Sequence, residues 1–112
     1  MNNIDEQRQL VDKIYWLVRD SLGDEYDTAT CRIDYPRFDD GSSSIGTRLS
    51  YERKGDTKYG QLRYPDDLIL YDVVPQLHAA MKAHTGGDWQ AFTLTINKDG
   101  SVTTKFEYQD ET

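Results

Sequence analysis

Residues 89–108 read WQAFTLTINKDGSVTTKFEY and contain two runs in which apolar and polar side chains alternate. The apolar positions are Phe92, Leu94 and Ile96 in the first run and Val102, Phe106 and Tyr108 in the second. A period of two is typical of a β-strand that buries one face. Between the runs lie residues 97–100, Asn-Lys-Asp-Gly, and Gly100 suits the left-handed backbone position of a hairpin turn. The stretch therefore predicts an antiparallel β-hairpin.

The same alternation occurs in the middle of the chain. Its apolar positions are Ala29, Cys31, Ile33 and Tyr35, followed after a loop by Leu49 and Tyr51. The loop is residues 39–44, and a Lys-Gly-Asp turn at residues 54–56 leads into a third run at residues 59–64. These three runs predict a three-stranded meander.

Two other segments have a helical period. Apolar residues recur every three or four positions over residues 4–22, and Gly23 follows them. A second helical stripe ends before Gly86 and comprises Leu70, Val73, Val74, Leu77, Ala80, Met81 and His84. Pro75 lacks an amide hydrogen and is tolerated in the first turn of a helix, so the regular part of this helix is expected to begin near Asp72.

Together these elements predict one α+β domain over residues 1–112, in the order α-β-β-β-α-β-β. We expect a five-stranded antiparallel sheet with two helices packed on one face, and an open second face. Trp89 and Phe106 are expected in the core. The open face is expected to carry charged and threonine side chains, namely Arg32, Asp34, Arg48, Glu52, Thr93, Thr95, Thr103, Lys105 and Glu107.

The composition limits the kinds of partner. The chain has 13 Lys and Arg against 20 Asp and Glu, which gives a net charge of −7. A negative field repels phosphate and anionic lipid, so we expect no direct binding to nucleic acid or to a membrane, and a basic protein is the natural partner. The sequence predicts no signal peptide and no membrane span. Cys31 is the only cysteine, which favours a reducing compartment and therefore the cytoplasm.

The closing hairpin also carries a pattern of specific residues. The pattern is Trp89-x-x-Phe92-Thr93-Leu94, then Asp99-Gly100, then Phe106-Glu107-Tyr108-x-Asp110. It resembles the closing hairpin of the YezG-like antitoxin and immunity family, and the predicted order of elements is similar to that family's order. The resemblance implies a small cytosolic protein that binds and neutralises a cognate toxin, commonly a nuclease domain of a secreted or contact-delivered polymorphic toxin. Because these hairpin residues are expected to be structural, the resemblance implies a function without locating its site.

Few side chains suggest catalysis or metal binding. His78 and His84 are six residues apart, which places them about 120° apart around a helix axis and does not suit a shared metal ion. Cys31 lies on an apolar strand face and is expected to be a buried thiol, although a distant histidine could approach it in space. The loop serines at 42–44 lack a nucleophile motif, and the chain has no glycine pattern for phosphate or dinucleotide binding. We therefore predict no catalytic residue, no metal, no cofactor and no enzymatic activity.

Five carboxylates are candidates for partner recognition, namely Asp39, Asp40, Asp66, Asp67 and Asp99. In a meander, the loop after the first strand and the segment after the third strand lie at the same end of the sheet. A second helix that crosses to the opposite end, followed by a returning strand, would bring Asp99 to that same end. We expect an acidic end that faces a basic partner. The alternative is a set of solvated loop carboxylates.

Trp16 is a further candidate for partner binding. On the first helix it lies almost opposite the apolar stripe, among Asp12, Arg19 and Asp20. An aromatic side chain on a polar helix face can be an anchor at a binding interface or a dimer contact. Packing beneath a loop is the alternative.

Two classes of function are consistent with these sequence features. The first is an immunity protein that takes part in contact-dependent growth inhibition and occludes the active site of a basic toxin domain, expected to be a nuclease. Such inhibition needs no catalytic residues of its own. The alternative is an acidic secretion chaperone that holds an effector segment in extended form, although the sequence predicts no third helix at its end, which counts against this class. The expected assembly is a monomer or a homodimer.

Overall fold

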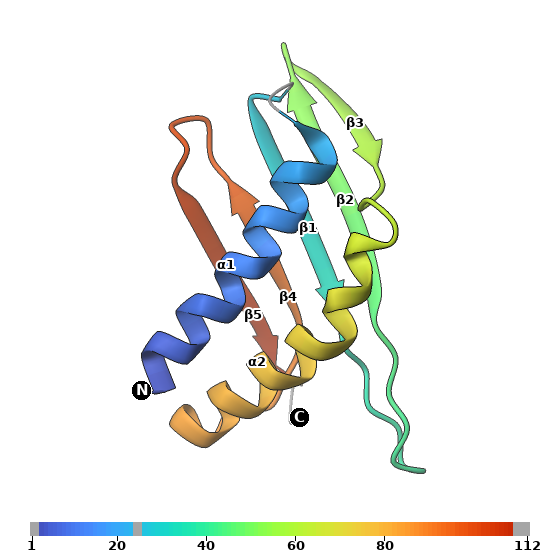
Figure 1. The fold of residues 1–112 in the computed structure, drawn as a ribbon, viewed down its shortest axis with the longest axis vertical. Coiled ribbons are helices and arrows are strands. Elements are labelled where there is room, and N and C mark those ends of the chain that lie inside the picture. The colour runs from blue at the N-terminus through green and yellow to red at the C-terminus, as the bar shows by residue number, and fades with distance from the viewer. Residues whose placement is uncertain (1–2, 24–25, 109–112) are drawn as a thin grey trace.

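The computed structural model describes residues 3–23 and 26–108, which form two α-helices, one 3-10 helix and five strands. In chain order these are α1 (Asn3–Leu22), β1 (Thr28–Asp34), β2 (Gly46–Arg53), β3 (Asp56–Gly60), η1 (Asp66–Ile69), α2 (Leu70–Thr85), β4 (Trp89–Ile96) and β5 (Val102–Tyr108). The strands form one antiparallel sheet in the order β3-β2-β1-β4-β5 (Figure 1). The predicted α+β class and the predicted order of elements are confirmed.

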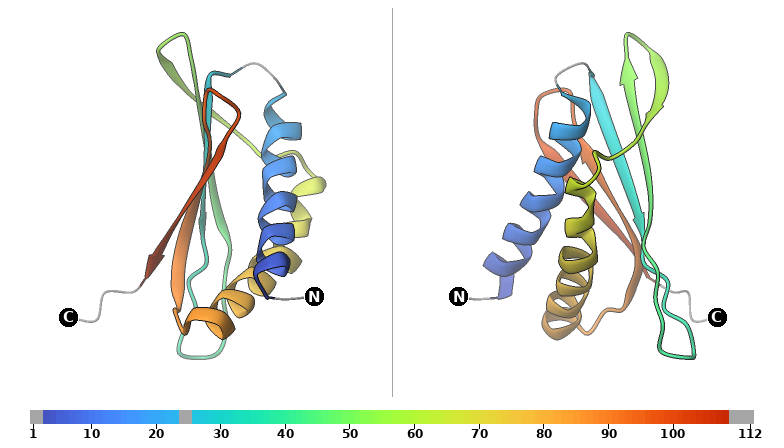
Figure 2. Two further views of the ribbon diagram at one scale, coloured as in Figure 1. Left: turned by 90° about the vertical axis from the view of Figure 1, so that its left-hand side faces the viewer. Right: turned by 45° about the vertical axis from the view of Figure 1, so that its right-hand side comes forward.

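Both helices lie on the same face of the sheet (Figure 2). Their inward side chains join the central strands in one buried cluster. Ile14 and Val18 of α1 and Val74 and Leu77 of α2 are all fully buried in it. Residues three or four positions apart share a helix face, so the apolar stripes read from the sequence are the faces that pack against the sheet.

β1 is the central strand of the sheet, and its burial alternates along its length. Cys31 and Ile33 are fully buried, whereas Arg32 between them is partly exposed on the other face. Cys31 lies opposite Leu49 of β2 and Leu94 of β4. This period-two burial is the pattern that the sequence predicted for a sheet covered on one side.

The predicted hairpin is formed by β4 and β5. The amide of Gly100 donates to the carbonyl oxygen of Asn97 at 2.9 Å, and Gly100 has a φ of 88°, which favours glycine. Trp89 is fully buried, with ring centroids 5.2 Å from Phe92 and 5.5 Å from Phe106. Phe106 is only partly buried, because β5 is an edge strand with no neighbour on its outer side.

The face of the sheet that points away from the helices is polar, as predicted. Arg32 lies near its centre and pairs with Asp34 at 3.1 Å and with Glu107 of β5. Ala91 lies in register between Asp34 and Glu107 and is only 3% exposed. The side chain of Arg32 therefore reaches across β4 to link the centre of the sheet to its β5 edge.

The third strand differs from its predicted position: the sequence predicts residues 59–64 after a turn at residues 54–56, whereas β3 begins at Asp56 and ends at Gly60. Beyond this point the chain leaves the sheet for the helix layer. The amide of Arg63 donates to Oγ of Ser21 on α1 at 2.8 Å, and Leu62 packs against the core. A Cβ atom at Gly60 would lie 3.2 Å from Cδ2 of Leu22, so the chain passes close to the end of α1. Residues 61–64 therefore contact the helix layer in place of a neighbouring strand.

The second helix begins two residues before its predicted start at Asp72. α2 starts at Leu70, directly after the 3-10 turn η1, and Pro75 is its sixth residue. The proline removes one early intrahelical hydrogen bond, which the packed helix tolerates. His84 was expected on the buried stripe but is exposed, because the last turn of α2 extends past the core. His78 is the buried histidine, at 9% exposure.

Candidate functional site

The five aspartates expected at one acidic end lie in three separate places, so that prediction is wrong. β1 and β4 are antiparallel, and Ala29 near the start of β1 lies opposite Ile96 at the end of β4. Asp99 follows β4 and therefore lies near the start of β1. Asp39 and Asp40 follow the end of β1, at the opposite end of the sheet (Figure 1).

The direction of α2 explains this separation. Because β3 ends at Gly60 and the chain crosses at once into the helix layer, η1 begins partway along the molecule. α2 then runs toward the end of the sheet that holds the loop between β1 and β2 (Figure 1). β4 starts at that end and carries the chain, with Asp99, back to the other. Asp66 and Asp67 remain at the start of the helical segment, away from both tips.

Asp39 and Asp40 lie near the tip of residues 36–44, a hairpin that projects beyond the sheet (Figure 1). The amide of Phe38 donates to the carbonyl oxygen of Ser42 at 2.9 Å. Ser42 donates to Oδ1 of Asp40 from its hydroxyl at 2.6 Å and from its amide at 2.9 Å, and these bonds lower the pKa of Asp40. The tip is thus an ordered, charged turn with Phe38 half-exposed beside it.

Asp99 occupies the tip of the other hairpin in the same manner. Its Oδ1 accepts from the hydroxyl of Ser101 at 2.6 Å and from the amide of Ser101 at 2.9 Å. These two hydrogen bonds lower the pKa of Asp99. The carboxylate therefore stabilises its own turn.

A polar cluster that the sequence did not predict fixes the base of the 36–44 hairpin. Nε2 of His78 lies 2.7 Å from Oδ1 of Asp88, which also pairs with Arg37. Arg37 donates to the carbonyl oxygen of Trp89 at 3.0 Å and stacks over the ring of Tyr35. The hydrogen bond with His78 and the charge of Arg37 lower the pKa of Asp88. No local motif indicates this cluster, because Arg37 and Asp88 are 51 residues apart in sequence.

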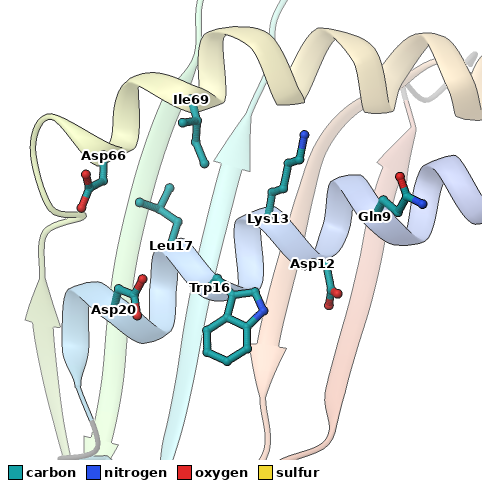
Figure 3. Close-up of a pocket in the computed structure, with 8 residues that line it drawn as sticks. All are labelled: Gln9, Asp12, Lys13, Trp16, Leu17, Asp20, Asp66 and Ile69. Atoms are coloured by element: carbon teal, nitrogen blue, oxygen red, sulfur yellow. The ribbon is translucent and has the colours of Figure 1, made fainter.

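Trp16 and Asp66, two of the predicted site residues, both line a groove between α1 and η1 (Figure 3). We call this hollow the α1–η1 groove. It has a volume of about 530 Å³ and is open to solvent. Its lining residues are Gln9, Asp12, Lys13, Trp16, Leu17, Asp20, Asp66 and Ile69. Figure 3 shows Leu17 and Ile69 pointing toward one another between the two elements, with the indole of Trp16 at the outer rim.

Trp16 is 53% exposed, which confirms its predicted place on the polar face of α1 and excludes packing beneath a loop. Its ring meets the ring of Tyr15 edge to face at a centroid distance of 5.2 Å. Cζ of Arg19 lies 5.9 Å from the Trp16 ring centroid. The indole is therefore supported from its own helix while much of its surface stays open to a partner.

The rim of the groove is negatively charged. Asp12, Asp20 and Asp66 contribute three carboxylates, and Lys13 contributes one ammonium group. All four side chains are exposed. In the described part of the chain, none of the three carboxylates takes part in an ion pair. The groove thus combines an apolar floor with an excess of negative charge, three carboxylates against one ammonium group.

Two further hollows are more mixed in character. One, of about 450 Å³, lies between α1 and the edge strand β5 and includes Val102 and Phe106. The other, of about 440 Å³, lies between β2–β3 and the segment before η1, and it includes Tyr59 and Asp67. Oδ1 of Asp67 is buried there without a hydrogen-bond partner among the described residues. The adjacent Asp66 and Asp67 thus border different hollows.

The remaining candidates for catalysis or metal binding are Cys31, His78 and His84. Cys31 is fully buried, as predicted, and burial raises the pKa of its thiol to about 12. His78 packs in the aromatic cluster of Trp89, while His84 is exposed. Over residues 3–23 and 26–108, no group of three or more His, Cys, Asp or Glu side chains is arranged to hold a metal ion. None of the described helices combines the length and the apolar character that a membrane crossing requires.

Comparisons with known proteins found no family model that matches this sequence and no matching curated protein. The resemblance of the closing hairpin to the YezG-like family therefore stays a prediction. Within that pattern, Trp89 and Phe92 are core residues, and Asp99 belongs to a turn. Asp110, the last residue of the pattern, lies outside the described residues.

Proposed function

We propose that this protein is an immunity protein, or antitoxin, that binds a cognate toxin domain and blocks its active site. The observation that carries the proposal is the α1–η1 groove, where the exposed indole of Trp16 lies among unpaired carboxylates. Large aromatic side chains are the usual anchors of protein interfaces, and complementary charge guides the partners together. The resemblance of the closing hairpin to the YezG-like family supports the same function.

The net charge of −7 fits a basic toxin domain such as a nuclease. A nuclease uses Lys and Arg side chains to hold phosphates, and carboxylates of an inhibitor compete for the same side chains. The inhibitor needs no cofactor and no catalytic residue for this role. We place this encounter in the cytoplasm, where a delivered nuclease meets its substrate.

Co-expression with the product of the adjacent reading frame tests the proposal. That product should be toxic when expressed alone, and it should be harmless and co-purify when expressed with this protein. The purified partner should lose its activity as this protein is added in equal amount. A partner that becomes more soluble but keeps full activity would contradict the proposal and would favour the secretion chaperone.

Trp16→Ala should weaken binding to that partner by roughly 2 kcal/mol or more, because it removes the aromatic anchor. Phe38→Ala is the matched control, since Phe38 is also 53% exposed but lies on the 36–44 hairpin, outside the groove. Isothermal titration of both variants against the purified partner measures the difference. Equal losses for the two variants would contradict a binding site at the groove.

A further inference from the structure

The indole of Trp16 lies between two carboxylates along α1. Asp12 precedes Trp16 by four residues and Asp20 follows it by four, so the three side chains share one helix face at intervals of about one turn. Both carboxylates are exposed, and neither has a cationic partner within the described chain. A flat aromatic surface is therefore flanked on both sides by unneutralised negative charge.

η1 supplies the facing wall of the same groove. Asp66 adds a third carboxylate, and Ile69 points toward Leu17 of α1 (Figure 3). Ile69 is 40% exposed, so part of this apolar contact remains open to solvent. The groove thus offers three kinds of contact: an aromatic ring, a set of carboxylates and an aliphatic floor.

Arginine is the side chain whose chemistry matches all three contacts. Its planar guanidinium stacks on aromatic rings, and its N–H groups form paired hydrogen bonds with carboxylates. Its methylene stem packs on apolar surface while the charged group stays near water. The Trp16 ring already has one guanidinium beside it, because Cζ of Arg19 lies 5.9 Å from the ring centroid. Lysine has a more strongly hydrated point charge and lacks the planar group.

We propose that the α1–η1 groove binds an arginine side chain of the partner protein, with the guanidinium against Trp16 and between Asp12 and Asp20. This inference deepens the proposed function and rests on it for the identity of the partner. Its chemistry can nevertheless be tested without the partner, because the groove is formed by this chain alone.

The probe is N-acetyl-arginine amide, added to the 15N-labelled protein while the indole N–H signals are followed by NMR. The Trp16 signal should shift in a saturable manner, whereas the signal of fully buried Trp89 should stay in place as an internal reference. N-acetyl-citrulline amide has nearly the same shape without the charge and should cause little shift. Added salt should weaken the arginine response, because the carboxylates are exposed.

Two double variants with the same change in charge locate the site. Asp12→Asn with Asp20→Asn should weaken binding of the arginine probe about threefold to tenfold, since it removes two exposed charge contacts. Asp39→Asn with Asp40→Asn changes charge only on the 36–44 hairpin and should leave the affinity unchanged. The absence of a saturable Trp16 shift, an equal shift with the citrulline probe, or equal weakening by both double variants would overturn the inference.

The two proposals fail separately. If the groove binds the arginine probe but the protein does not neutralise the product of the adjacent reading frame, the proposed function is wrong and the arginine site stands. If the protein neutralises that product but the groove does not bind the arginine probe, the arginine site is wrong and the proposed function stands.

Discussion

Trp16 and Trp89 have opposite roles because of where they stand in their elements. Trp89 is fully buried among Tyr35, His78, Phe92 and Phe106. Trp16 lies on the outer face of α1 with about half its surface in water. The residue type alone does not separate these cases. The position of each tryptophan relative to the apolar period of its element does.

Replacement of the two tryptophans should therefore have very different effects on stability. Trp89→Ala should reduce the free energy of unfolding by about 3–5 kcal/mol, because it leaves a cavity in a packed aromatic cluster. Trp16→Ala should change it by less than about 0.5 kcal/mol, since the indole is a surface side chain. Urea unfolding followed by circular dichroism measures both. A loss at Trp16 as large as that at Trp89 would mean that the indole is part of the packing and not a free anchor.

At the level of elements, the point at which β3 ends decides where the candidate residues lie. The strand and helix periods predicted the element order, the covered face and the burial of Cys31 and Trp89, because each depends on residues close in sequence. They did not predict that the chain would leave the sheet at Gly60. That exit depends on contacts with Ser21 and Leu22 of α1, about forty residues earlier in the chain.

Local patterns also fail to predict where the five aspartates lie. They place all five at one end of the sheet, because they imply that α2 runs antiparallel to β3. In the structure α2 runs on toward the far end of the sheet, and β4 pairs antiparallel with β1. Trp16 and Asp66, which both line the α1–η1 groove, are 50 positions apart in sequence, and they lie on the same groove only because α1 and η1 pack side by side. The exposure of Trp16 itself was foreseeable from its place opposite the apolar stripe.

The polar cluster of Arg37, His78 and Asp88 connects the 36–44 hairpin, α2 and the start of β4. This cluster should make the stability of the fold depend on pH. Contacts with His78 and Arg37 lower the pKa of Asp88 below the usual 3.8. A carboxyl with a lowered pKa in the folded state stabilises the fold above its usual pKa and loses that contribution as pH falls through the lowered value. Asp88→Asn should therefore cost about 1 kcal/mol or less near neutral pH, because the side chain is half-exposed and solvent screens it.

The difference in unfolding free energy between the wild type and Asp88→Asn, measured by urea titration at several pH values, is the test. It should be present above the usual carboxyl pKa of 3.8 and should shrink as pH falls below that value, because protonation of Asp88 removes the charge that its partners stabilise. Asp20→Asn is the control, since Asp20 has no ion pair within the described residues and should show no such change. A difference that persists unchanged in strong acid would show that the ionised carboxylate is not what holds the cluster.

Across the whole molecule, the charge of −7 is distributed over several surfaces. Asp39 and Asp40 lie near one hairpin tip, Asp99 lies at another, and the groove carries its own carboxylates. On the open face of the sheet, Arg32 neutralises part of the acidic charge. Net charge alone would therefore speed the approach of any basic partner, whereas only a local site can hold it.

The measurement that separates these two effects compares two triple variants in their binding to the proposed toxin partner. Asp12→Asn, Asp20→Asn and Asp66→Asn remove the carboxylates of the groove, and Asp39→Asn, Asp40→Asn and Asp99→Asn remove those of the tips. Each set removes three negative charges and changes the net charge from −7 to −4.

Surface plasmon resonance at two salt concentrations gives the association rate and the dissociation constant for both triple variants. The groove variant should bind at least about tenfold more weakly, while the tip variant should stay within about threefold of the wild type and differ mainly in association rate at low salt. Equal affinities for the two variants, or a larger loss for the tip variant, would contradict the α1–η1 groove as the proposed binding site.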